Sequence, residues 1–316
     1  MSCKTISHLN PLALKIDVDT LLGTRVGVPR LVDLLKKHNA NATFLFSLGP
    51  DHTGRAIKRV FRPGFLNKVS RTSVLEHYGL KTLLYGTVLP GPDIPARCAD
   101  IMKQVRDAGF EVGIHTFDHV KWQDYVSEKD ADWTSREMIS ATRRFEEIFG
   151  LAAKTHGAAG WQMNIHALRL TQRLGFDYCS DGRGRCPFMP VYRAELIACP
   201  QLPTTLPTLD EVIGLNGITP KNVAADLLRR TATPAPMGHI FTLHAELEGM
   251  KLATVFDALL KGWRQQGYQL VSLNELYKTL DRNSLPRCEV LQGEVPGRSG
   301  TLLLQGHEFL PTTAHL

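Results

Sequence analysis

The sequence predicts an α/β fold in which parallel strands are joined by crossover helices. From Ala13 onward, short runs of β-branched or aromatic residues alternate with longer stretches of helical periodicity, and this alternation is typical of that class. Seven strand-like runs occur, a number that suits a barrel. The composition agrees, because 316 residues with 43% hydrophobic and 22% charged side chains lie in the range of folded proteins and exclude disorder for most of the chain.

Each predicted strand is short and apolar, and a helical pattern separates most neighbouring strands. The strands are expected at 13–18, 42–47, 111–115, 152–156, 176–180, 239–244 and 269–272. The helices are expected at about 28–39, 94–109, 134–149, 164–174, 220–232 and 251–266. Four of these helices are followed by a glycine, the residue that adopts a left-handed C-cap most easily. These glycines are Gly109, Gly150, Gly175 and Gly267.

Three stretches interrupt the alternation of predicted strands and helices. Residues 50–93 form a long insertion after the second strand, and residues 181–219 form a loop rich in proline and threonine after the fifth. Long loops in a compact domain are usually functional or disordered. Beyond Leu280 the sequence turns to Gly, Pro, Ser and Thr, so we expect one barrel domain over 1–283 and, at 284–316, a C-terminal tail or a loosely packed strand pair.

The formal charge of +6, from 37 basic and 31 acidic residues, favours an acidic partner such as an anionic membrane or nucleic acid. Residues 55–81 contain seven basic residues and one acidic residue, interleaved with apolar side chains. This mixture suits a segment, 55–89, that rests on anionic headgroups without crossing the bilayer. A helical subdomain with a solvated basic face is the alternative. A basic groove with aromatic residues that could stack on bases is absent, so nucleic acid is not expected.

The cysteines and the apolar runs bear on the compartment. The six cysteines form no C-x-x-C pair and no zinc-knot spacing, so we expect reduced thiols. The N-terminus has no apolar core long enough for export, and no run of 18 apolar residues occurs elsewhere. We therefore expect a cytoplasmic protein.

Two aspartates close the first strand, in L-K-I-D-V-D-T. Strand alternation puts Asp17 and Asp19 on one face and Leu14, Ile16 and Val18 on the other. An Asp at the end of a strand is often only a helix N-cap or the start of a turn. Two carboxylates this close, however, cannot both ionise freely unless a cation lies between them or their pKa values separate.

Two histidines follow the third strand, in E-V-G-I-H-T-F-D-H. One helical turn separates His115 from His119, a spacing that lets two imidazoles bind one metal. They could also be unrelated histidines in a polar loop. Two imidazoles and an upstream carboxylate form a set that leaves positions open for water and substrate, as in catalytic metal sites.

A later strand, in G-H-I-F-T-L-H-A-E, ends in His244 and Glu246. A buried histidine that only completes the core is the common case. Its place at the end of a third strand favours a role in catalysis, because the carboxyl ends of parallel strands are where α/β folds place their active sites.

Glu246 is a candidate substrate contact, and two further stretches carry others. His156 ends a strand in K-T-H-G-A-A-G-W, where small residues would let the backbone approach a ligand before Trp161. Trp161 could equally belong to the core. Asp181 and Arg183, in S-D-G-R-G-R-C-P, are expected on a flexible loop that could reach an anion; a solvated charged loop explains them equally well.

Taken together, these motifs resemble the polysaccharide deacetylase family, also called the NodB-homology family, from Ala13 to about Leu280. The similar stretches are L-K-I-D-V-D-T, E-V-G-I-H-T-F-D-H-V-K-W-Q-D, T-H-G-A-A-G-W-Q, L-P-T-L-D-E-V-I-G and L-H-A-E-x-E-G. The resemblance implies a distorted (β/α)7 barrel and a divalent metal, zinc, manganese, cobalt or nickel, held by Asp19, His115 and His119. It implies Asp17 as catalytic base and His244 as catalytic acid. In many relatives the two aspartates are adjacent. Many relatives also have an arginine that orients the base, in the motif that corresponds to the stretch with His156 here.

Within the family, the resemblance is to members that remove a formyl group from 4-deoxy-4-formamido-L-arabinose linked to undecaprenyl phosphate. It therefore implies a role in lipid A modification and cationic peptide resistance, at the cytoplasmic face of the inner membrane, with residues 55–89 on the lipid. Deacetylation of an N-acetylated glycan is one alternative. A barrel that binds membranes without catalysis is the other, and the intact set of aspartates and histidines argues against it.

Overall fold

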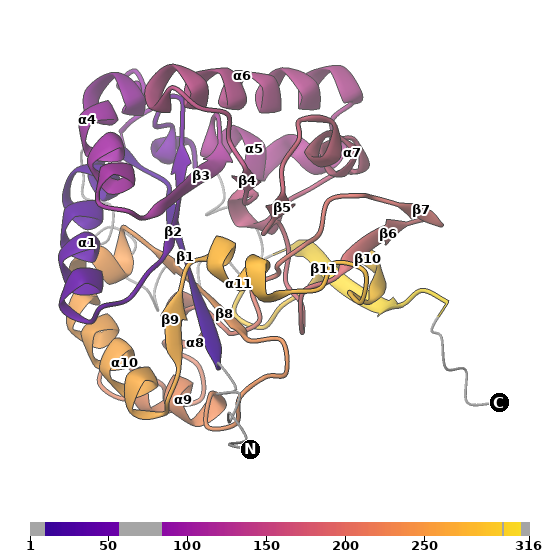
Figure 1. Cartoon of the computed structure of the whole chain (residues 1–316). Helices are drawn as coiled ribbons and strands as arrows, with labels where there is room; N and C mark the ends of the chain where they lie inside the picture. Colours follow the sequence, from indigo (N-terminus) through magenta and orange to yellow (C-terminus); the bar gives the residue numbers. More distant parts are fainter. Residues whose placement is uncertain (1–9, 57–83, 299, 311–316) are drawn as a thin grey trace.

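A seven-stranded parallel sheet forms the centre of the computed structural model, which describes residues 10–56, 84–298 and 300–310 (Figure 1). The strand order is β5-β4-β3-β2-β1-β8, and β9 pairs with the first residues of β1. All seven predicted strands are present. They are β1 (Pro11–Val18), β2 (Thr43–Ser47), β3 (Glu111–Thr116), β4 (Thr155–His156), β5 (Tyr178–Cys179), β8 (His239–His244) and β9 (Gln269–Val271).

The sheet curls into a half-barrel, and an irregular segment bridges its two edges. Residues 200–206 lie between β5 and β8 and bond to both. On one side, the Cys179 N–H donates to Pro200 O at 2.9 Å and the Leu202 N–H donates to Cys179 O at 2.7 Å. On the other side, the Thr205 N–H donates to Ile240 O at 3.0 Å. The barrel expected from the sequence is therefore completed by a chain segment that forms no regular strand.

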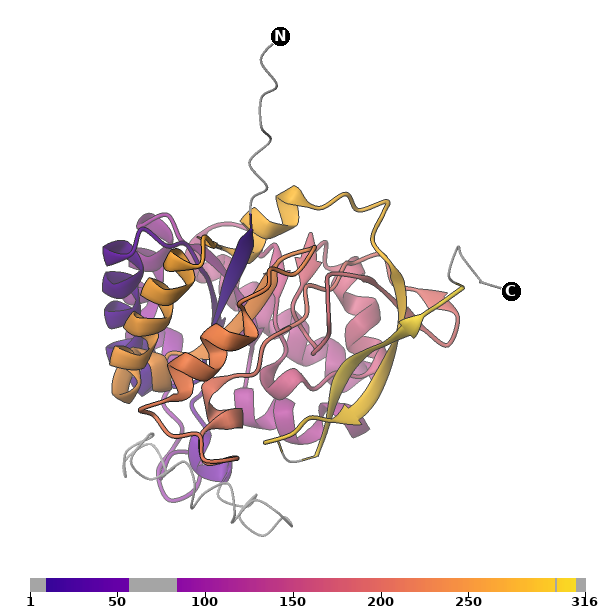
Figure 2. The same ribbon diagram turned by 90° about the horizontal axis from the view of Figure 1, so that it is seen from below.

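Most of the helices cover the outer face of the sheet and pack on the main hydrophobic core (Figures 1 and 2). The helices are η1 (Gly23–Gly27), α1 (Val28–Lys37), α4 (Ile94–Asp107), α5 (His119–Tyr125), η3 (Val126–Glu128), α6 (Ala131–Phe149), η4 (Ala159–Trp161), α7 (Ile165–Arg173), α8 (Leu209–Val212), α9 (Val223–Arg230), η5 (Leu247–Lys251), α10 (Ala253–Gln265) and α11 (Leu273–Thr279). The four glycines predicted to end helices all have left-handed φ, between 69° and 90°.

The inward-facing side chains of β1 and β8 form layers from the bottom of the barrel to its mouth. Ala13 pairs in register with Ile240, Lys15 with Thr242, and Asp17 with His244. The lowest layer is apolar, because Ala13 and Ile240 pack against Leu273 and Leu276 of α11. The interior therefore changes from hydrocarbon at the bottom to charged groups at the mouth.

A second, four-stranded sheet lies beside the barrel, in the order β11-β10-β6-β7. Its strands are β6 (Met189–Tyr192), β7 (Glu195–Leu196), β10 (Arg287–Glu294) and β11 (Thr301–Glu308). The sequence predicted either a tail or a loosely packed strand pair beyond residue 284. Residues 287–308 form an antiparallel pair, and β10 joins it to β6.

The insertion after β2 is described only at its two ends, because residues 57–83 lie outside the described residues. Pro50 pairs with Asp93, and the Gly54 N–H donates to Tyr85 O at 2.9 Å. The chain therefore leaves and re-enters the barrel at one place. In the part of the chain that the structure describes, no helix combines the length and the apolar character needed to cross a membrane.

Candidate active site

Polar side chains from β1, β3 and β8 meet at the mouth of the barrel. Parallel strands place their carboxyl ends at one edge of a sheet, so side chains far apart in the sequence become neighbours there. Asp17 lies directly opposite His244 in the register of β1 and β8. Asp19 follows β1, and His115 is the fifth residue of β3.

Asp19, His115 and His119 form a group that could hold a metal ion, with one ligand atom from each residue within 4.8 Å of the others. Asp19 Oδ1 lies 3.2 Å from His115 Nε2, and Asp19 Oδ2 lies 3.4 Å from His119 Nε2. Asp118 N-caps α5, whose first residue is His119. The helix start thereby fixes the position of the second imidazole.

The donor set fits a divalent cation. His115 Nδ1 donates to the carbonyl oxygen of Gly157 at 2.7 Å, which leaves the lone pair of Nε2 toward Asp19. Asp19 Oδ1 is buried and accepts no hydrogen bond of ordinary geometry. Burial raises the pKa of Asp19, but His119 and His115 lower it by more, so the carboxylate stays ionised. One carboxylate and two imidazoles accept zinc, manganese, cobalt or nickel.

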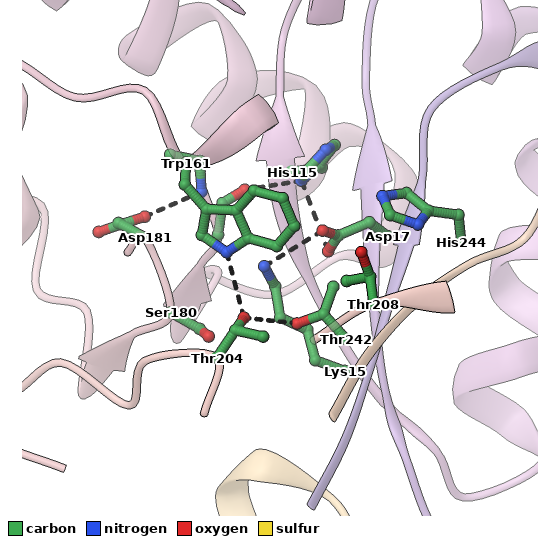
Figure 3. Close-up of polar contacts among 12 residues, drawn as sticks. Lys15, Asp17, His115, Trp161, Ser180, Asp181, Thr204, Thr208, Thr242 and His244 are labelled. Atoms are coloured by element: carbon green, nitrogen blue, oxygen red, sulfur yellow. Dashed lines mark hydrogen bonds and ion pairs between the residues drawn. The ribbon is translucent and has the colours of Figure 1, made fainter. Parts of the chain in front are cut away.

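Asp17 lies beneath this group and contacts a buried lysine (Figure 3). Its Oδ2 is 3.1 Å from the Nζ of Lys15, and its Oδ1 is 3.7 Å from His115 Nδ1. Asp17 is 3% exposed and Lys15 is fully buried. Lys15 is not among the site residues predicted from the sequence, although strand alternation places it on the same face as Asp17.

His244 and Glu246 have different surroundings. The ring Nδ1 of His244 is buried without a hydrogen-bond partner, and its main-chain N–H donates to Glu248 Oε2 at 2.8 Å. Glu246 Oε1 accepts from the main-chain N–H of Asp19 at 3.1 Å and from both the N–H and the hydroxyl of Thr20. Glu246 therefore holds the turn that carries Asp19.

His156 and Asp181 belong to a buried network, and the expected flexible loop is wrong for Asp181. His156 Nδ1 lies 2.6 Å from Asp181 Oδ1, which also accepts the Ala158 N–H. Asp181 Oδ2 accepts from the Gln201 side chain at 2.9 Å. Asp181 has no exposed surface. Its hydrogen bonds tie the end of β4 to the segment that closes the barrel.

Arg183 is also buried rather than on a solvated loop. It pairs with Glu211 of α8 and donates to Leu206 O at 3.0 Å. Its guanidinium lies 5.0 Å from the centroid of the Trp161 ring, and that of Arg298 lies 4.6 Å from it. The Trp161 ring, 2% exposed, is thus covered by two arginines. Glu211 and Arg298 were not predicted as site residues, since only the fold brings them to Trp161.

The comparisons with known proteins agree with this geometry. The sequence model of the polysaccharide deacetylase family matches residues 12–179. The probable 4-deoxy-4-formamido-L-arabinose-phosphoundecaprenol deformylase of Shewanella sediminis (strain HAW-EB3) is 36% identical over 297 residues, which are 93% of this chain and 94% of that protein. The protein of the same name from Wigglesworthia glossinidia brevipalpis is 31% identical over 90% of this chain and 98% of its own length.

The fold has relatives of known structure as well. A crystal structure from Mycobacterium smegmatis, described as that of a polysaccharide deacetylase, superposes with a TM-score of 0.62. The alignment covers 93% of this chain and 98% of that chain at 17% identity. At this identity the similarity concerns the fold alone.

Proposed function

The chain belongs to the polysaccharide deacetylase family, and from this premise we propose that it removes the formyl group from 4-deoxy-4-formamido-L-arabinose linked to undecaprenyl phosphate. The products are formate and the lipid-linked 4-amino sugar. The two relatives above carry the name of this activity and match nearly the whole chain. The reaction belongs to lipid A modification, which gives resistance to polymyxin and other cationic peptides.

One observation carries the proposal: a candidate metal group and two proton-transfer groups share the mouth of one barrel. Asp19, His115 and His119 are the three members of the candidate metal group. Asp17 and His244 lie beside it, opposite each other on adjacent strands. Hydrolysis of a formamide needs both a proton acceptor and a proton donor, because water must lose a proton and the leaving nitrogen must gain one.

We assign the roles as follows. Asp19, His115 and His119 would hold the divalent cation. When bound, the cation supplies Lewis acidity, which lowers the pKa of water from ~16 toward ~7 and polarises the formamide carbonyl. Asp17 accepts the proton that the attacking water loses. His244 donates a proton to the sugar nitrogen as the C–N bond breaks, so that formate and an amine leave.

The buried residues around Trp161 are proposed to shape the side of the barrel mouth that binds the sugar. Trp161 and Arg183 are themselves buried, so they would support the substrate-binding surface from within, as would His156 and Asp181. Glu246 would act indirectly, by holding the turn that carries Asp19. These roles are supported by burial and by hydrogen bonding to the strand ends.

The test is release of formate from the formamido lipid-linked sugar by the purified protein, with and without a chelator. We expect release that the chelator stops and that added zinc, manganese, cobalt or nickel restores. The matched control is the same sugar with an acetamido group. Faster release of acetate than of formate would contradict the proposal in favour of a deacetylase, and turnover unaffected by the chelator would contradict the metal assignment.

We also propose that residues 55–89 rest on the anionic surface of the cytoplasmic leaflet of the inner membrane. The support is the basic and apolar composition of this segment and the exposure of three apolar residues where the description of the chain resumes. Leu84 is 41% exposed, Val88 77% and Leu89 36%. Each cation near such a surface contributes about 1 kcal/mol.

Binding to vesicles with and without anionic lipid tests this proposal. Because Gly54 and Tyr85 are hydrogen-bonded to each other, residues 55–84 can be replaced by a short glycine linker without stretching the barrel. We expect the shortened protein to lose binding to anionic vesicles and keep its melting temperature. Replacing Val88 and Leu89 with serine separates the apolar from the charged contribution. Undiminished binding of the shortened protein would reject the proposal.

A further inference from the structure

We propose that Lys15 is a positioning residue for the reaction: its ammonium group holds the Asp17 carboxylate by Oδ2 and leaves Oδ1 to take the proton from water. The inference rests on the proposed function for the identity of the base. It concerns a lysine in the layer directly beneath that base, and none of the comparisons assigns it a role.

The contacts of Lys15 point to Asp17 and to little else. Nζ lies 3.1 Å from Asp17 Oδ2 and makes no other ion pair or hydrogen bond among the described residues. The Trp161 ring lies 5.4 Å from Nζ and covers it with an aromatic face. The hydroxyls of Thr204 and Thr242 bond to each other at 2.6 Å. A fully buried ammonium therefore has one charged partner (Figure 3).

A glycine beside Lys15 makes room for this side chain. Gly157 lies beside Leu45 and the stem of Lys15: a Cβ at this position would be 2.4 Å from Leu45 Cδ1, 2.9 Å from Lys15 Cε and 3.3 Å from Lys15 Nζ. The carbonyl of Gly157 also accepts the hydrogen bond from His115. A residue without a side chain is thus needed beside Leu45 and Lys15.

A counter-charge beneath Asp17 has a physical consequence. A buried carboxylate is costly unless it is paired, and a cation on one oxygen fixes the orientation of the other. Since Lys15 and Asp17 are two residues apart on one strand, the pair is held by the pleat of β1 itself and needs no mobile loop. The base is therefore oriented before substrate arrives.

The central variant is Lys15→Met, which keeps the apolar stem and removes the charge. With the formamido lipid-linked sugar we expect kcat to fall about 100-fold with little change in KM, because the loss affects the base rather than substrate binding. Lys15→Arg should recover at least tenfold of this loss, since a guanidinium can also pair with a carboxylate. In an Asp17→Asn background, Lys15→Met should have no further effect on kcat.

Lys121→Met is the matched control. Lys121 also pairs with one carboxylate, Glu137, and lies over an indole, Trp133, at 5.3 Å. It sits on α5, which begins at His119, so it tests whether the loss of any lysine pair near the metal group slows the enzyme. We expect its kcat to stay within twofold of the wild-type value.

Zinc affinity, measured by competition with a chelating dye, gives a second readout that needs no substrate. Removing a buried positive charge near two carboxylates should strengthen binding of a divalent cation, so we expect Lys15→Met to bind Zn²⁺ at least threefold more tightly and Lys15→Arg to bind it as the wild type does. Thermal unfolding checks that each variant is folded. If Lys15→Met does not fold, Lys15→Gln replaces it with the same criteria.

The outcomes separate this inference from the proposed function. A wild-type protein that releases no formate would refute the proposed function. The zinc measurement would still test whether the charge of Lys15 acts on the two carboxylates and the metal group. If the wild type is active, the positioning role is overturned by kcat of Lys15→Met within threefold of wild type. A rise in KM alone would overturn it in favour of substrate binding, and equal or weaker zinc affinity would overturn it as well.

Discussion

Asp19 is the residue on which the candidate metal group depends, because it contacts both imidazoles. Its carboxylate reaches His115 through one oxygen and His119 through the other. The turn that carries it is held by Glu246 at three donors. The position of Asp19 therefore depends on the Glu246 carboxylate, which contacts the Asp19 turn and neither imidazole in these hydrogen bonds. Supporting groups of this kind usually tune metal affinity.

We predict that His115→Ala removes both metal binding and formate release. The imidazole supplies one of three ligands and is oriented by Gly157, so its loss should reduce kcat/KM by about 100-fold or more. Zinc content after dialysis and formate release are the measurements. His166→Ala, on α7, is the control that should retain both. A zinc-loaded, active His115→Ala protein would refute the ligand assignment.

We predict that Glu248→Gln changes how stability depends on pH. Burial raises the pKa of Glu248 from 4.5 to about 8. In the wild type, the unfolded state loses the proton above pH 4.5 while the folded state keeps it, so this group lowers stability as pH rises from 4.5 to 8. Glutamine removes the effect, and the variant should gain about 5 kcal/mol relative to wild type between pH 4.5 and 8.

The measurement is urea unfolding of both proteins at several pH values with the metal content held equal. The difference in the free energy of unfolding should grow with pH up to about 8 and then level off. Parallel curves for the two proteins would show that Glu248 is ionised in the folded state at neutral pH.

At the scale of elements, glycines serve two different physical purposes. The glycines that end α4, α6, α7 and α10 have left-handed φ, and at each of them an added Cβ would meet no atom within 4 Å. They are needed for their backbone conformation alone, which is why a helical pattern followed by glycine predicted them. Gly27 and Gly249 are different, because η1 and η5 meet there: a Cβ on Gly27 would lie 2.0 Å from the Ala245 carbonyl oxygen.

We predict that alanine is tolerated at one kind of glycine and not at the other. Gly150→Ala should cost about 1 kcal/mol, the cost of a left-handed conformation. Gly27→Ala should cost about 3 kcal/mol or more, because main chain must move. It should also slow turnover, since Ala245 follows His244. Urea unfolding and formate release test both. Equal costs for the two variants would contradict the distinction.

At the scale of the whole molecule, the C-terminal strand pair completes the wall around Trp161. Arg298 lies in the connection between β10 and β11 and reaches Glu211 Oε1 at 2.8 Å. Burial raises the pKa of Glu211, but Arg298 and Arg183 lower it by more, so the net shift is downward. The last strands are therefore tied to the barrel by a buried ion pair.

We predict that Arg298→Met destabilises the protein by about 3 kcal/mol at neutral pH, because it takes one partner from a buried carboxylate. A lowered pKa stabilises the folded state above the unfolded-state value, and that stability is lost as pH falls through the folded-state pKa. The difference from wild type should therefore shrink below about pH 4.5. Arg144→Met, which removes a surface pair with Asp93, should cost less than about 1 kcal/mol.

Urea unfolding at pH 7 and pH 4 measures both variants. A difference between Arg298→Met and wild type that is the same at the two pH values would contradict the assignment of Arg298 as a partner of the ionised Glu211.

Local patterns were sufficient for the strands and for the helix ends. The alternation in L-K-I-D-V-D-T and the helical periodicities depend on neighbours a few residues away, and the seven strands are confirmed. The same patterns placed Asp19, His115 and His119 at one edge, and the structure brings them within 4.8 Å of each other. The chemical roles of these residues remain predictions that the variants above test.

Partners far apart in the chain required the folded molecule. In the sequence, Lys15 is one polar residue in an apolar strand. Only the folded barrel shows that the Trp161 ring covers its ammonium group. Asp181 and Arg183 looked solvated because the residues that bury and pair them, Gln201 and Glu211, belong to the segments that cross between β5 and β8. Periodicity reports which face a residue occupies, but which charge it meets there depends on how the chain packs.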